Sequence, residues 1–178
     1  MPTLKLLPHP DYPAPAVTAL EVEAAFTHDG GLSLAYLLTA DLAQLRIPES
    51  VQPARADGLW RHTCLEVFVQ ADRGPGYREF NFSPSGQWQA YVFTAYRDGG
   101  LLESVPAPSM SRDDAPGRLV LTCTLPAAAL PGGGQLRLGL TAVLEDADGS
   151  LSYWSLRHPP GKPDFHHTHG FALTLERP

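Results

Sequence analysis

The sequence has few cysteines and no long apolar run, and each shortage excludes a class of protein. Cys64 and Cys123 are the only cysteines among 178 residues, so a disulfide framework and a CxxC zinc or redox pair are both excluded. No apolar run reaches the roughly 18 residues of a transmembrane helix. The first residues also lack the apolar stretch and cleavage site of a signal peptide. We therefore expect a cytoplasmic protein with buried free thiols and no membrane partner.

Basic residues and catalytic motifs are also scarce. Thirteen Lys and Arg against nineteen Asp and Glu give a net charge of −6, with no basic run. This balance is a poor match for a phosphate backbone, so we expect no nucleic-acid partner. The sequence contains no GxSxG, HExxH or P-loop motif, and no GxGxxG after a strand. Hydrophobic residues still make up 43%, which is enough for a core.

Short alternating apolar runs, separated by turn residues, are the main signal that the sequence does contain. They predict strands at residues 17–26, 32–39, 63–70, 77–82, 87–96, 119–125, 136–144, 151–157 and 171–175. Turns are predicted at 28–31, 83–86 and 148–149, irregular loops at 48–58 and 98–117, and a single helical turn at 126–130. We therefore predict an all-β antiparallel sandwich of nine or more strands with almost no helix. It should form one domain over residues 1–178.

The first candidate site is in residues 57–69. Trp60 lies just before a strand, and Glu66 falls on the face opposite the apolar residues of that strand. An indole can cover the apolar face of a sugar, and a carboxylate can hold its hydroxyls by charge-assisted hydrogen bonds. The pair predicts a polyol site with both side chains on one wall of a pocket. An edge tryptophan and a solvated strand glutamate are the alternative that spacing leaves open.

A second cluster, in residues 77–88, has polar side chains on one strand face. Alternation places Tyr77, Glu79 and Asn81 together, and a neighbouring strand would bring them beside Glu66. Their ordinary role would be structural.

The third cluster, residues 153–169, holds four of the seven histidines. Their crowding beside Asp164 suggests zinc or copper, but the adjacent His166 and His167 lack the spacing of metal ligands. We predict that the loop from 158 to 169 borders the ligand site and is not a metal centre.

Together these segments resemble bacterial DOMON-like proteins related to the family 9 carbohydrate-binding modules. The resemblance covers about residues 15–176 and rests on residues 57–69, on residues 77–88 with the nearby Tyr91, Tyr96 and Arg97, and on residues 153–167. It implies a β-sandwich whose site, in sugar-binding members, pairs two aromatic rings with a glutamate, an arginine and amide side chains. Trp60 and Glu66 match the first ring and the glutamate, and Trp154, or else Phe165, would supply the second ring.

The resemblance also implies that Asn81, Gln87 and Arg97 supply the amide and guanidinium groups of the site. The histidine loop follows the Trp154 strand, and its imidazoles can donate and accept hydrogen bonds at a polyol rim. The predicted ligand-binding set is Trp60, Glu66, Asn81, Gln87, Arg97, Trp154, His158, Phe165, His166 and His167. Unlike secreted modules, this chain carries no glycanase and no evident calcium loop. We expect a non-catalytic domain for a small saccharide or sugar-like molecule, without a cofactor; the oligomeric state stays open.

Two other functions remain open. Some members of the wider DOMON group bind haem between axial ligands such as Met and His, and here Met110 with His62 or His158 would have to serve. A sugar-acting enzyme is the other alternative. It would depend on three carboxylates, those of Glu66, Glu79 and Asp164.

Overall fold

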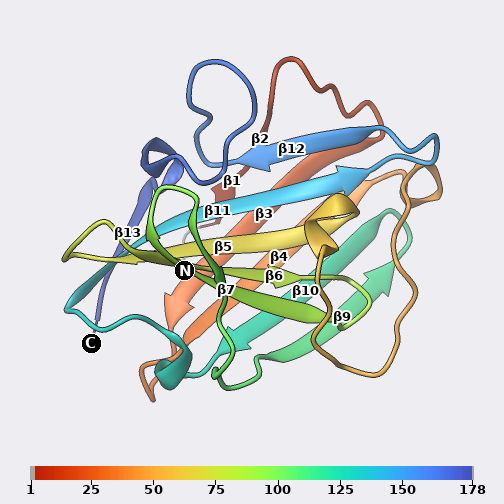
Figure 1. Cartoon of the computed structure of the whole chain (residues 1–178). Helices are drawn as coiled ribbons and strands as arrows, with labels where there is room; N and C mark the ends of the chain where they lie inside the picture. Colours follow the sequence, from red (N-terminus) through yellow and green to blue (C-terminus); the bar gives the residue numbers. More distant parts are fainter. Residues whose placement is uncertain (1–2, 178) are drawn as a thin grey trace.

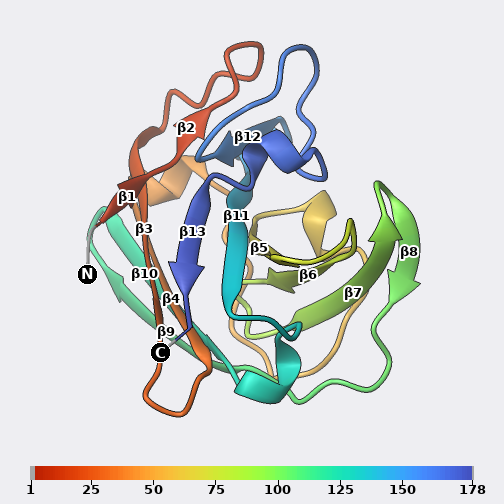
Figure 2. The same cartoon turned by 90° about the vertical axis from the view of Figure 1, so that its left-hand side faces the viewer.

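The computed structural model describes residues 3–177 as two antiparallel β-sheets packed face to face, with the core between them (Figures 1 and 2). The five-stranded sheet has the order β1-β3-β4-β10-β9. Its strands are β1 (Leu4–Lys5), β3 (Val17–Phe26), β4 (Leu32–Ala40), β10 (Arg118–Leu125) and β9 (Ser109–Ala115).

The eight-stranded sheet has the order β2-β12-β11-β5-β6-β7-β8, and β13 also pairs with β11. Its strands are β2 (Leu7–Pro8), β12 (Leu151–Ser155), β11 (Gln135–Glu145), β5 (Cys64–Ala71), β6 (Tyr77–Phe82), β7 (Trp88–Ala95), β8 (Asp98–Leu101) and β13 (Leu173–Glu176). The predicted all-β sandwich is thus confirmed.

Helical structure in residues 3–177 is limited to four single 3₁₀ turns. They are η1 (Leu42–Gln44), η2 (Leu59–Arg61), η3 (Ala127–Ala129) and η4 (Thr168–Gly170). The third lies within the helical turn predicted at 126–130. None of the helices in this part of the chain is long and apolar enough to cross a membrane.

The core forms where the period-two apolar positions of the two sheets meet. On β5, Leu65, Val67 and Val69 are buried in the interface between the sheets, as their alternation predicts. The hairpin predicted at 28–31 joins β3 to β4, with Gly30 at a φ of 79°. The predicted turn at 83–86 joins β6 to β7 in the same way, with Gly86 at a φ of 94°. Glycine adopts such left-handed backbone without steric cost.

The loop predicted at 98–117 is wrong in two places, because it contains β8 and β9. Each strand pairs with a single neighbour within its sheet, β8 with β7 and β9 with β10. The side chains of β8 are all exposed, and those of β9 are mostly exposed. An edge strand needs only backbone hydrogen bonds to one partner, so its sequence carries little apolar alternation.

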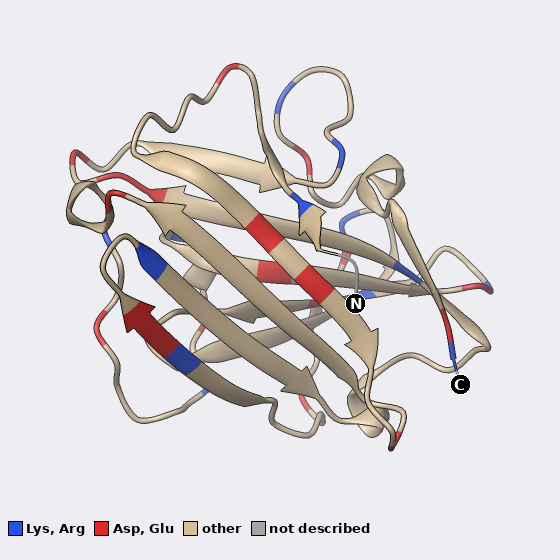
Figure 3. Ribbon diagram, turned by 180° about the vertical axis from the view of Figure 1, so that it is seen from behind, with Lys and Arg blue, Asp and Glu red and all other residues tan. Residues whose placement is uncertain are grey.

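The two sheets differ in what covers their outer faces. The outer face of the five-stranded sheet carries acidic residues along β3, including Glu21 and Glu23 (Figure 3). Strand β5 of the other sheet is buried on both faces through seven of its eight residues. Its outer face is therefore covered by other parts of the chain, and the candidate site lies there.

Candidate ligand-binding site

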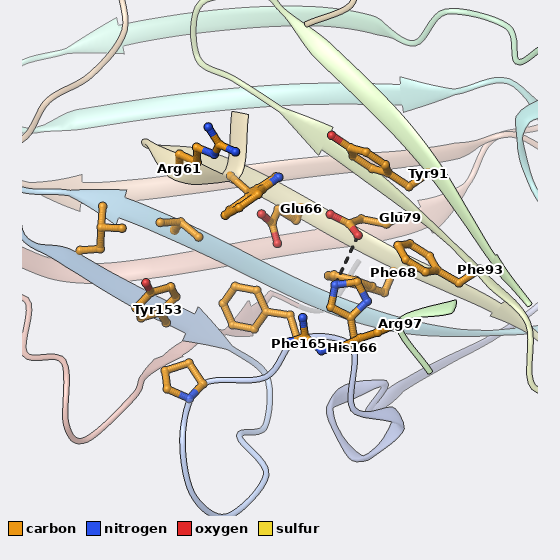
Figure 4. Close-up of a pocket in the computed structure, with 14 residues that line it drawn as sticks. Arg61, Glu66, Phe68, Glu79, Tyr91, Phe93, Arg97, Tyr153, Phe165 and His166 are labelled. Carbon is orange, nitrogen blue, oxygen red and sulfur yellow. Dashed lines mark ion pairs between the residues drawn. The ribbon is translucent and has the colours of Figure 1, made fainter. Parts of the chain in front are cut away.

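A pocket of about 490 Å³ lies on the outer face of the eight-stranded sheet (Figure 4). Its floor comes from β5, β6 and β7, and its walls come from η2, β12 and the loop before η4. The lining residues are Trp60, Arg61, Glu66, Phe68, Glu79, Tyr91, Phe93, Arg97, Val143, Leu151, Tyr153, Pro163, Phe165 and His166.

Strand register brings the floor side chains together. Phe68 of β5 is paired with Glu79 of β6, which is in turn paired with Tyr91 of β7. In the next row, Glu66 lies between Thr141 of β11 and Asn81 of β6. Paired residues of antiparallel strands point to the same face, so two glutamates reach one pocket from neighbouring strands.

Both glutamates are buried: Glu66 is 2% exposed and Glu79 is 6% exposed. Burial raises the pKa of Glu66 well above its usual range, the nearby Glu79 raises it further, and the hydrogen bond from Thr141 opposes this. Burial likewise raises the pKa of Glu79 to about 7, against the lowering effects of Asn81 and Arg97. At neutral pH the two facing carboxyls therefore retain a proton that exposed glutamates would have released.

Few protein groups contact these carboxyl groups. The hydroxyl of Thr141 donates to Oε2 of Glu66 at 3.2 Å. Nε2 of His166 lies 3.7 Å from Oε2 of Glu79, which is beyond hydrogen-bond distance (Figure 4). Asn81 lies close enough to influence Glu79, yet neither of its amide atoms has a partner in hydrogen-bond geometry among the described residues. The floor thus has unused hydrogen-bonding capacity.

Tyr77 fixes the position and protonation of His166. The backbone N–H of Arg97 donates to the Tyr77 hydroxyl at 3.1 Å, and that hydroxyl lies 2.8 Å from Nδ1 of His166. Since the hydroxyl already accepts from Arg97, its own hydrogen is free to donate to Nδ1, and in that tautomer the ring proton is on Nε2, facing Glu79. Burial, and then Arg97, lower the pKa of His166 to about 4, so the imidazole is neutral at pH 7.

Asp164 anchors the loop that carries His166. Its carboxylate accepts from the Tyr96 hydroxyl at 2.7 Å, from Nη2 of Arg97 at 2.9 Å and from the backbone N–H of His166 at 3.2 Å. Burial raises the pKa of Asp164, but the bonds from Tyr96 and Arg97 outweigh it and hold the pKa below its usual range. The turn after β7 and the loop before η4 are therefore tied together beside the pocket.

Trp60 lies in η2, at the mouth of the pocket, and is 46% exposed. Gly58 precedes the turn at a φ of 72°, and the carboxylate of Asp57 accepts from the Gly58 N–H and from the Tyr91 hydroxyl. The guanidinium of Arg61 lies 5.1 Å from the centre of the indole ring. The indole thus offers an open face on a turn that Asp57 holds to the floor.

The structure brings five of the predicted site residues into this pocket. They are Trp60, Glu66, Arg97, Phe165 and His166. Trp60 and Glu66 share one pocket, as the sequence predicts, while their contact with a ligand stays a prediction.

The structure does not bring the other five predicted residues to the pocket lining. Trp154 is 4% exposed in the core between the sheets, because it faces inward on β12, where its indole N–H donates to Ser152. The choice of Trp154 as the second ring therefore does not fit its position. Phe165, the other candidate, is in the lining.

The remaining four have local roles. Asn81 is fully buried beside the floor, and Gln87 accepts from Ser85 in the turn before β7. A ring nitrogen of His158 lies 2.8 Å from the carbonyl of Leu7, and His167 caps η4 by accepting from the N–H of His169. The prediction that the whole histidine loop borders the site thus applies to His166 and its neighbours before η4.

Several lining residues were missing from the predicted set. Alternation already placed Glu79 beside Glu66, and Glu79 does line the pocket, whereas Tyr77 and Asn81 do not. Phe68, Tyr91 and Phe93 also alternate with core residues on their strands, so strand parity could have found them. Arg61 and Tyr153 come from a turn and from β12, and only the packed structure places them.

The metal and haem alternatives gain no support from the described residues. No group of three or more His, Cys, Asp or Glu side chains in residues 3–177 is arranged to hold a metal ion. Met110 lies on β9 of the five-stranded sheet, while His62 contacts Glu145 and His158 contacts Leu7. These side chains do not form an axial pair.

Comparison with known proteins gives a match of fold. No protein-family model matches the sequence, and no curated protein matches it. A crystal structure from Bacteroides uniformis, of a protein described as a "putative carbohydrate-binding protein", matches with a TM-score of 0.62. The match covers 99% of this chain and 86% of the other, at 17% sequence identity. This chain therefore shares the fold of that protein.

Proposed function

We propose that the pocket binds a saccharide or a sugar-like small molecule, and that the protein is a non-catalytic ligand-binding domain. The observation on which this depends is the pairing of an open indole face, Trp60, with two buried carboxyl groups, Glu66 and Glu79, in one pocket. Aromatic faces cover the C–H surface of a sugar ring, and carboxyl groups bind its hydroxyls. The description of the Bacteroides uniformis protein supports the same ligand class.

The volume and position of the pocket fit a small ligand. A volume of about 490 Å³ lies in the range of small-molecule sites, about 300–1,000 Å³. Phe165 and Tyr153 form a second aromatic wall, with ring centroids 6.1 Å apart. Part of this proposal is that the chain is related to the DOMON-like proteins and family 9 modules that its sequence resembles, and acts as one domain.

Titration calorimetry with a panel of monosaccharides and disaccharides tests the proposal. The panel should contain at least one sugar that binds, and Trp60→Ala should weaken its binding about tenfold or more, because a stacked ring contributes about 1–3 kcal/mol. Val51→Ala is the control, since Val51 is 52% exposed and outside the pocket lining. If no saccharide binds, or if Trp60→Ala binds like the unchanged protein, the proposal is wrong.

A sugar-acting enzyme is a second candidate, favoured by the pKa of about 7 for Glu79 beside a second carboxyl. A carboxyl that titrates near neutral pH can act as a general acid. Incubation with nitrophenyl glycosides separates the two functions. Release of nitrophenol that Glu79→Gln abolishes would establish catalysis, whereas sugar binding without turnover supports a binding domain.

A further inference from the structure

We propose that the ligand of this pocket carries a protonated amine, and that the ammonium group lies between Glu66 and Glu79. The inference rests on the proposed saccharide function and narrows the ligand class to amino sugars and similar cationic polyols.

The first argument is that two buried carboxyl groups share a pocket in which no Arg or Lys of residues 3–177 forms an ion pair with either of them. Glu66 and Glu79 come from the adjacent strands β5 and β6. Glu79 is paired with Phe68, two residues after Glu66, and both glutamates face the cavity (Figure 4). Buried acids in proteins are normally paired with a positive group, because desolvation of an unpaired charge is costly. Within residues 3–177, Glu66 has no ion-pair partner, and Glu79 has only His166 at 3.7 Å.

The positive groups around the pocket are engaged elsewhere. Arg97 is paired with Asp164 at 2.9 Å, and Arg61 lies over the ring of Trp60. His166 receives a hydrogen bond from Tyr77 and is neutral at pH 7. None of these side chains neutralises both carboxylates.

The other groups that face the pair are uncharged near neutral pH. Tyr91 is bound to Asp57, and burial raises its pKa further above the usual range. Burial also raises the pKa of Tyr153. Thr141 donates a single hydrogen bond to Glu66. The pocket floor therefore offers carboxyl acceptors in excess of the donors that the protein supplies.

Unpartnered polar groups at the floor point to a bound donor. Glu79 is 6% exposed, and neither His166, at 3.7 Å, nor Asn81, which lies near enough to lower its pKa, makes a hydrogen bond with its carboxyl in full geometry. The amide of Asn81, on the same face and next to Glu66 in register, is also unpartnered. An ammonium group brings three N–H donors and one positive charge, so on binding it replaces the proton that the pair retains and forms hydrogen bonds with both carboxylates.

The aromatic lining favours the same chemistry. Phe68, Phe93 and Tyr91 surround the floor, and Trp60 and Phe165 are higher on the walls. A cation among aromatic faces is attracted by their π-electrons, by about 0.5–2 kcal/mol depending on desolvation. A metal ion fits less well, because Glu66, Glu79 and His166 are not arranged as metal ligands, and no group of three or more such side chains in residues 3–177 is. The organic ammonium group is thus the cation that this site suits.

Matched pairs of sugars test the inference. Glucosamine and glucose, galactosamine and galactose, and mannosamine and mannose differ only in the amine or hydroxyl at C2. At neutral pH, at least one amino sugar should bind about tenfold or more tightly than its hydroxyl partner, equal to about 1.4 kcal/mol. N-acetylglucosamine, which keeps the nitrogen without the charge, should lose this preference.

Two variants locate the effect. Glu79→Gln should reduce the amine preference, measured in that variant as the ratio of the affinities for an amino sugar and its hydroxyl partner, to within about twofold. Glu21→Gln removes the same charge from β3 on the other sheet and should leave the preference unchanged (Figure 3). If hydroxyl sugars bind and their amino partners bind no more tightly, the ammonium inference is refuted and the proposed function stands. If no sugar of either series binds, both are refuted.

Discussion

Replacing Glu79 with glutamine should remove a pH dependence from the stability of the protein. In the folded chain the pKa of Glu79 is raised from 4.5 to about 7, chiefly by burial. At a pH between these two pKa values, the folded state keeps the proton of Glu79, whereas the unfolded state has released it. The free energy of unfolding therefore falls as the pH rises through this window, and the unfavourable contribution is complete above the folded pKa.

The magnitude follows from the two pKa values. At about 1.36 kcal/mol for each pKa unit, the rise from 4.5 to about 7 corresponds to about 3 kcal/mol. Glutamine keeps the shape of the side chain and cannot ionise. Glu79→Gln should thus be more stable than the unchanged protein by up to about 3 kcal/mol near pH 8, with the difference much smaller near pH 5. Because Glu66 faces Glu79, the slope belongs to the pair.

Urea unfolding at a series of pH values measures this difference. Glu145→Gln is the control, because Glu145 is also a buried carboxyl but has partners. Burial raises its pKa, yet the bonds from His62 and Arg46 lower it overall, so its stabilising effect is lost as the pH falls. This variant should be less stable at neutral pH. A constant difference between the unchanged protein and Glu79→Gln from about pH 5 to pH 8 would refute the reasoning.

Three other substitutions test which residues support the folded core and which contact the ligand. Trp154→Ala should lower the free energy of unfolding by about 3–5 kcal/mol, since the indole is buried, while sugar affinity of the folded protein stays unchanged. Phe165→Ala should do the reverse, weakening sugar binding about tenfold with little change in melting temperature. Gly139→Ala would place a methyl group 2.7 Å from a ring carbon of Phe171, so thermal melting should show a loss of about 1–3 kcal/mol. Equal effects of Trp154→Ala and Phe165→Ala on binding would contradict this assignment.

The parts of the fold that could be predicted depend on local alternation. On β5, period-two spacing places Leu65, Val67 and Val69 in the core and Glu66 on the other face. The burial of Glu66 could not be predicted in this way, because the residues that line the pocket with it, such as Tyr153 and Phe165, lie far from it in the sequence. Burial of that kind is a property of tertiary packing.

The second aromatic ring of the pocket could not be predicted, because the sequence does not fix which face of β12 points to the core. Each face of β12 carries one aromatic ring and at least one serine, with Tyr153 on one side and Trp154 on the other. A shift of one residue exchanges the two faces, so the sequence alone does not decide whether Trp154 faces the pocket or the core, and Phe165, the other candidate, lies in a loop without such a pattern. Pairing with β11 decides it, since Val143 and Tyr153 are partners and both line the cavity.

The attachment of the loop before η4 has a consequence for how ligand preference can change. The acid pair belongs to β5 and β6, whereas Phe165 and His166 belong to a loop held by the bonds of Asp164 and Tyr77. The acidic floor and the aromatic wall of the pocket therefore belong to different segments of the chain, and substitutions can change one without changing the other. An exchange of residues 162–167 that keeps Asp164 would leave the sandwich core untouched. New ligand specificities could then arise by loop replacement on a constant acidic floor.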